Sequence, residues 1–114
     1  SVYERVSETV RALKAIAVEE RVVLLVAVQL NRNAGAGGER PEMDMLRDSG
    51  ATEEAVDRIV ALWAPEQQKG LSDDERAKYR GYVYACLLKN RKGLLGDIAK
   101  LRYSPGRRLV ELAP

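Results

Sequence analysis

The stretch VVLLVAVQ, residues 22–29, decides which fold class this sequence predicts. Seven apolar residues follow one another without a polar break, and valine, which is β-branched, is the commonest among them. Such a run is typical of a strand covered on both faces, as in the parallel sheet of an α/β protein. Gln29 then follows the carboxyl end of the strand, where open α/β sheets hold ligands. An ordinary water-exposed glutamine at a strand end is the alternative.

The segments around this stretch complete an α/β pattern. Residues 2–19 place apolar side chains at helical spacing and polar ones mostly on the other side, which predicts an amphipathic helix. Residues 65–80 are polar and predict a surface excursion that includes a helical turn. We further expect a short helix at 51–57, a second buried strand at 59–63 and closing β segments at 82–88, 96–103 and 109–112.

Composition limits the chemistry that this chain can perform by itself. The 114 residues contain one cysteine and no histidine. These counts exclude imidazole metal ligands, a Ser-His-Asp triad, a thiolate zinc site and an internal disulfide. We expect one domain in a reducing, cytoplasmic environment, because neither a signal peptide nor a membrane span is visible. Since the chain begins inside a helical pattern, we also expect it to be part of a longer polypeptide.

Positive charge is concentrated near the carboxyl end. The net charge is +2, yet residues 81–114 carry seven basic and only two acidic side chains. This excess indicates an anionic partner such as phosphate or nucleic acid, with a solvated strand face as the alternative. A second basic feature is the glycine-rich stretch 31–41, which contains Arg32 and Arg40. It is not a phosphate-binding loop, because no Gly-Lys-Ser/Thr follows it.

Three segments resemble the C-terminal half of the ATPase domain of DnaB-type replicative helicases. RALKAIA at 11–17 with VQLNR at 28–32 is similar to the family's SLKALA and SQLNR. LRDSGATE at 46–53, after Arg-Pro, is similar to LRESGSIE, with Asp57 in register with the family's final aspartate. LKNRKG at 88–93 resembles GKQRNG. Val28 and Met45 depart from the pattern, where the family has serine and aspartate.

The resemblance implies a partial RecA-like core that works in a ring. Members of this family bind ATP and Mg²⁺ between neighbouring subunits, and no Walker A or Walker B motif occurs in this sequence. We therefore expect the chain alone to be inactive. By resemblance, Lys89 and Arg91 reach the γ-phosphate bound by the neighbouring subunit, with Arg91 as the arginine finger. Gln29 senses the γ-phosphate or orients the attacking water.

The resemblance also implies a single-stranded DNA channel and a homohexameric ring. Primase and a helicase loader are further partners that it suggests. Two other functions remain open from the residues: a non-catalytic module that binds nucleic acid or a helicase ring, and a RecA-fold ATPase of recombination or repair. The residues assigned to DNA contact by the resemblance are Arg32, Arg40, Arg47, Asp48 and Gly50.

Overall fold

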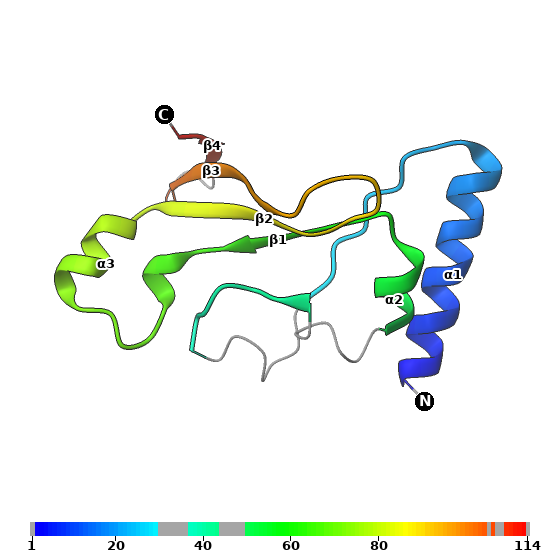
Figure 1. Ribbon diagram of the computed structural model, residues 1–114, viewed down its shortest axis with the longest axis horizontal. Coiled ribbons are helices and arrows are strands. Elements are labelled where there is room, and N and C mark those ends of the chain that lie inside the picture. Colours follow the sequence, from blue (N-terminus) through cyan, green and yellow to red (C-terminus); the bar gives the residue numbers. More distant parts are fainter. Residues whose placement is uncertain (1, 30–36, 44–49, 105, 107–108, 114) are drawn as a thin grey trace.

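The computed structural model describes residues 2–29, 37–43, 50–104, 106 and 109–113 (Figure 1). Its elements follow the order helix, helix, strand, two short helices and three strands. They are α1 (Val2–Glu20), α2 (Gly50–Ala55), β1 (Arg58–Trp63), the 3-10 helix η2 (Pro65–Gln67), α3 (Asp73–Tyr79), β2 (Tyr82–Asn90), β3 (Gly96–Ser104) and β4 (Leu109–Leu112). No helix among these described residues is long and apolar enough to cross a lipid bilayer.

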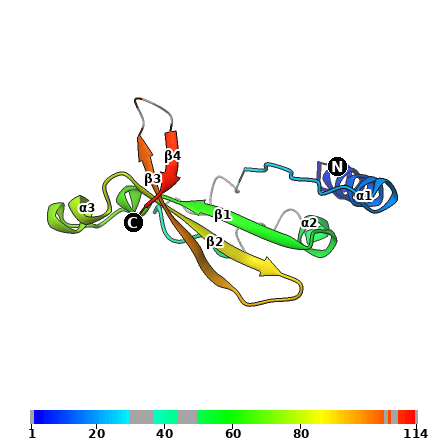
Figure 2. The ribbon, with the colours of Figure 1, turned by 90° about the horizontal axis from the view of Figure 1, so that it is seen from above.

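The four strands form one antiparallel sheet in sequence order, β1-β2-β3-β4. In β1 and β2, Arg58 pairs with Asn90 and Trp63 pairs with Tyr84, so the two strands run side by side over the whole of β1. Figures 1 and 2 show α1 and α2 at one end of this sheet and α3 at the other. The start of β1 and the end of β2 therefore lie beside the α1–α2 pair.

The first helix matches its sequence pattern, and α1 packs against α2. Ser7 is buried on α1, whereas Val6, Ile16 and Val18 are 36%, 49% and 66% exposed. An amphipathic helix buries its apolar stripe only where another element covers it. The expectation that α1 is a core helix is therefore wrong for part of its apolar stripe.

Residues 22–28 do not form the buried parallel strand that their composition predicts. They run on from α1 without a strand assignment, and Val23 and Leu25 are 100% and 96% exposed. A strand exists only where neighbours pair with its N–H and C=O groups, and every strand pairing among the described residues is antiparallel and made elsewhere. Without such neighbours, the apolar run stays extended and exposed to water.

The core lies between the central strands and is small. Cys86 is fully buried on β2, and Ala85 and Ala61 beside it are almost so. Burial raises the pKa of the Cys86 thiol, which agrees with the inert packing role expected for it. The second apolar strand was expected to be buried, but β1 is an edge of the sheet in the described part and buries only Ala61.

The segments at the far end of the sheet are tied down by specific contacts. Ser72 caps α3, where its side chain accepts a hydrogen bond from the backbone N–H of Glu75. Trp63 lies 6.1 Å from Tyr84 between ring centroids and donates its indole N–H to the carbonyl of Gly38 at 2.8 Å. The last residues of the glycine-rich stretch are therefore fastened to the sheet.

Candidate functional site: the end of β2 and its basic turn

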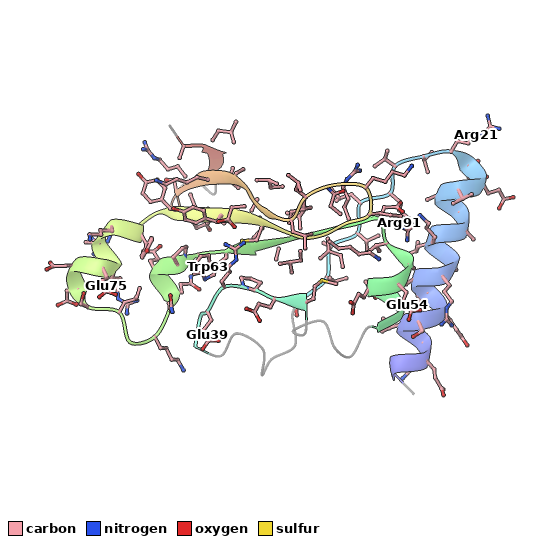
Figure 3. All side chains as sticks on the ribbon, viewed as in Figure 1. Arg21, Glu39, Glu54, Trp63, Glu75 and Arg91 are labelled. Atoms are coloured by element: carbon pink, nitrogen blue, oxygen red, sulfur yellow. The ribbon has the colours of Figure 1, made fainter. Side chains whose placement is uncertain are left out.

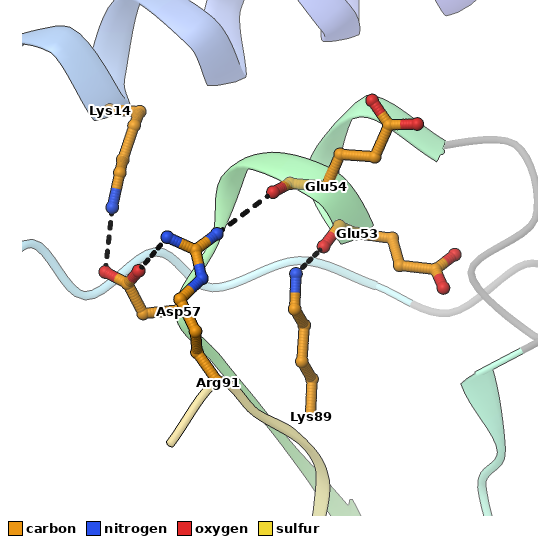
Figure 4. Close-up of polar contacts among 6 residues, drawn as sticks. All are labelled: Lys14, Glu53, Glu54, Asp57, Lys89 and Arg91. Carbon is orange, nitrogen blue, oxygen red and sulfur yellow. Dashed lines mark hydrogen bonds and ion pairs between the residues drawn. The ribbon is translucent and has the colours of Figure 1, made fainter.

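Lys89 and Arg91 lie where β2 ends and the connection to β3 begins. The Lys89 ammonium donates to the carbonyl of Glu53, and Arg91 Nη2 donates to the carbonyl of Glu54 at 3.3 Å. Both side chains thus turn to the same side and reach α2, as Figure 4 shows. The expectation that two extended residues at this spacing share a side is confirmed.

The end of a helix explains why two cations gather here. The last carbonyl groups of a helix lack intrahelical donors and carry a partial negative charge. In the short α2, the carbonyl of Thr52 accepts from the backbone N–H of Val56 at 3.2 Å, and those of Glu53 and Glu54 accept from the two cations. The carboxyl end of α2 is thereby satisfied by side chains from β2 and the turn after it.

Asp57, between α2 and β1, connects three parts of the chain. Its Oδ1 lies 2.8 Å from Arg91 Nη1, and its Oδ2 lies 2.8 Å from the ammonium of Lys14 on α1. Its backbone carbonyl also accepts a hydrogen bond from the backbone N–H of Arg91 at 3.0 Å. One aspartate therefore joins α1, the α2–β1 junction and the basic turn.

The surroundings of Asp57 favour its charged form. The hydrogen bond from Lys14 holds the pKa of the Asp57 carboxyl below its ordinary value of 3.8, and the charges of Lys14, Arg91 and Arg58 act in the same direction. Loss of hydration opposes this shift without cancelling it. The carboxylate therefore remains ionised, and available to Arg91, throughout the neutral pH range.

The other predicted site residues fall into separate places. Gln29 is exposed at the end of the extended apolar run. Arg40 pairs with Asp97 of β3, with 2.5 Å between Nη1 and Oδ1. Gly50 begins α2, which carries the carbonyls that hold Lys89 and Arg91. Arg32, Arg47 and Asp48 lie outside the described residues.

Comparison with known proteins identifies the family. A family model described as the DnaB-like helicase C terminal domain matches residues 1–108. The chain belongs to this family. Its relatives include the replicative DNA helicase DnaB of Haemophilus influenzae, 32% identical over 94 residues that make up 82% of this chain and 19% of that protein. DnaB of Helicobacter pylori strain J99 is 29% identical over 79% of this chain and 15% of its own length.

A solved structure supports the same assignment. A helicase ATPase domain superposes with a TM-score of 0.84 at 25% identity, covering all of this chain and 38% of that one. The expected α/β, RecA-like helicase fold is confirmed by this match, although the parallel pairing is not present among the described strands. The chain spans less than a fifth of the length of the DnaB relatives that it matches.

The residues present fit one half of a DnaB-type nucleotide site. Lys89 and Arg91 supply positive charge at a partly exposed turn, and the Arg91 side chain is 46% exposed. Guanidinium and ammonium groups are the donors that phosphoryl oxygens prefer. Among the described residues no cluster of three or more Asp, Glu, His or Cys could hold a metal ion. The donor set therefore suits the γ-phosphate side of a shared site.

Sequence reasoning did not assign a role to Asp57 or Lys14. Asp57 is visible in the sequence as the match to the family's final aspartate, but it lies 34 residues before Arg91. Lys14 is seen only as a polar position off the apolar stripe of its helix. Only the packing of α1 on α2 and the pairing of β1 with β2 bring the three charges together.

Proposed function

We propose that this chain is the downstream half of the ATPase domain of a replicative DNA helicase, and that it supplies the trans-acting part of an ATP site. Family membership and the superposition on a helicase ATPase domain support this proposal. The observation that carries it is the gathering of Lys89 and Arg91 at one partly exposed turn, on the side facing α2. The DnaB match favours replication over recombination or repair.

In this proposal the bound nucleotide and Mg²⁺ supply the phosphoryl group to be transferred and part of the charge that neutralises it. Arg91 stabilises the negative charge that develops on the γ-phosphoryl oxygens, and Lys89 orients the same group. Gln29 senses the γ-phosphate or orients the attacking water. The chain lacks a phosphate loop and a Walker B aspartate, so we propose that a preceding segment and the neighbouring subunit provide them, and that the chain alone is inactive.

The matched DNA segment suggests a contact to single-stranded DNA. We propose that Arg32, Arg40 and Arg47 bind phosphates in the channel of a homohexameric ring, with the backbone near Gly50 beside them. Asp48 orients Arg47 or contacts the sugar. Such contacts are independent of base sequence and strongly dependent on salt. Primase and a helicase loader belong to the same cytoplasmic replication assembly in this proposal.

The finger is tested in an ATPase domain made by joining the upstream half of a DnaB relative to this chain. Arg91→Ala should lower DNA-stimulated ATP hydrolysis by about 10³-fold or more. Lys92→Ala, which removes an adjacent charge, is the matched control and should leave turnover nearly unchanged. Equal turnover in the Arg91→Ala and parent proteins would show that Arg91 is not the finger.

The trans arrangement needs a second experiment. Rings mixed from Arg91→Ala subunits and phosphate-loop-defective subunits form some interfaces in which an intact phosphate loop meets an intact Arg91. Each parent ring has none, so mixing should restore part of the activity. A mixed ring that is as inactive as both parents contradicts a trans-acting Arg91.

A further inference from the structure

We propose that Asp57 is the positioning residue of the arginine finger, fixing the Arg91 guanidinium against the carboxyl end of α2. This inference rests on the proposed function in assigning Arg91 a role in phosphoryl transfer. The tether itself is a property of this chain alone. Figure 4 shows the arrangement, in which the Arg91 side chain lies between Asp57 and the carbonyl of Glu54.

The geometry restrains Arg91 at three points. Its backbone N–H donates to the Asp57 carbonyl at 3.0 Å, its Nη1 contacts Asp57 Oδ1 at 2.8 Å, and its Nη2 donates to the Glu54 carbonyl at 3.3 Å. A guanidinium is planar and carries five N–H donors in a rigid fork. Restraint of both Nη atoms therefore defines the plane and direction of the whole group. The side-chain contacts use two of the five donors, which leaves the others for a phosphoryl group.

Asp57 is itself restrained by its second oxygen. Lys14 on α1 contacts Oδ2 at 2.8 Å, so the carboxylate cannot rotate freely between partners. Lys14, Arg58 and Arg91 supply the positive charge around it, and Arg58 begins β1, one residue later in the chain. The tether is thus anchored to α1 and α2 rather than to the turn that carries Arg91. Because α2 follows residues 44–49, a shift of α2 would move the guanidinium with it.

A positioning role explains an ion pair that adds little stability. Arg91 and Asp57 are 46% and 53% exposed, and ion pairs at such sites contribute little to folding because water and salt screen them. A long flexible side chain gains instead from being held near its productive orientation, since misplacement of a catalytic group by about 1 Å can reduce the rate about 10²-fold. Asp57 therefore acts on the rate through Arg91 without touching the substrate.

The tether is tested directly on the 114-residue chain by nitrogen-15 NMR of arginine side chains, with Arg91 assigned through Arg91→Lys. In the parent chain we expect slow rotation and slowed hydrogen exchange of the Arg91 guanidinium. Asp57→Asn should abolish both, Asp57→Glu should retain part of the protection, and Asp74→Asn on exposed α3 should change neither. Arg91 signals that are identical in the parent and Asp57→Asn chains would overturn the proposal.

The consequence for catalysis is tested in the joined ATPase domain. Asp57→Asn should lower kcat by about 10–100-fold with little change in KM, and Asp57→Glu should restore part of it. The double variant Asp57→Asn/Arg91→Ala should be no slower than Arg91→Ala alone, because Asp57 acts only through Arg91. Multiplied losses in the double variant would overturn the positioning role. An active Arg91→Ala domain would instead refute the proposed finger, while the NMR result would still report the tether.

Discussion

The indole N–H of Trp63 donates a hydrogen bond to the backbone carbonyl of Gly38 at 2.8 Å, and this contact fastens the end of the glycine-rich stretch to β1. Figure 3 shows Trp63 and Arg91 at opposite ends of β1 and β2. The same stretch is held again where Lys69 donates its backbone N–H to the carbonyl of Gly37 at 2.6 Å. Residues 37–43 therefore belong to the folded body at the end of the sheet remote from the basic turn.

Gly38→Ala tests how strongly this anchor depends on glycine. Gly38 has a φ of +73°, and a Cβ there would collide with the backbone of Gln67. We expect a loss of about 1–3 kcal/mol in the free energy of unfolding, measured by urea titration. Gly70→Ala is the matched control, because Gly70 has a φ of +85° but open space around it, and it should lose less. Equal losses would show that the close approach to Gln67 contributes nothing.

Asp97→Asn tests the proposed DNA contact of Arg40. The Arg40–Asp97 pair is partly exposed, with side chains 39% and 44% accessible, so its rupture requires about 1 kcal/mol or less. In the assembled ring, the released guanidinium should raise single-stranded DNA affinity by up to about fivefold and steepen its salt dependence. Asp74→Asn makes the same charge change on α3. Equal effects of the two variants would mean that Arg40 does not contact DNA.

Acid should remove the contribution of Asp57 to stability. Its pKa in the folded chain is lowered below the ordinary 3.8, so the contribution is complete above that value and disappears as the pH falls through the folded pKa. The difference in unfolding free energy between the parent and Asp57→Asn should be constant from pH 8 to pH 5 and shrink below about pH 4. Urea titrations across this range measure it. Lys14→Met should reduce the dependence, and a difference that changes between pH 5 and pH 8 would point to another group.

Leu25→Gln tests the exposed apolar run. Leu25 is 96% exposed, so this change should alter the unfolding free energy of the 114-residue chain by no more than about 0.5 kcal/mol. Cys86→Ser, which places a hydroxyl at a fully buried position, should lose about 1–3 kcal/mol in the same urea titration.

In the joined ATPase domain, by contrast, Leu25→Gln should lose about 1.5–3 kcal/mol, because a partner strand would then bury residues 22–28. An equally small loss in both proteins would contradict the proposed completion of the sheet.

Local patterns in the sequence predicted most of the elements. The amphipathic repeat of 2–19 became α1, Ser72 capped α3, and 109–112 became β4 with the same bounds. Matched segments indicated the helicase family and the basic pair Lys89 and Arg91 before any coordinates. Each of these depends on neighbours within a few residues or on a motif, which is why sequence alone was sufficient.

Tertiary structure decided what depends on partners distant in the chain. The apolar composition of 22–28 expresses a strong preference for a buried strand, yet composition cannot supply the pairing that a strand requires, and here the run is exposed. Likewise, nothing local links Lys14, Asp57 and Arg91. Their charges meet at 2.8 Å because α1 packs on α2 and because β1 pairs with β2. The sequence by itself therefore determined which cations this protein carries, and the fold decided which carboxylate aims Arg91.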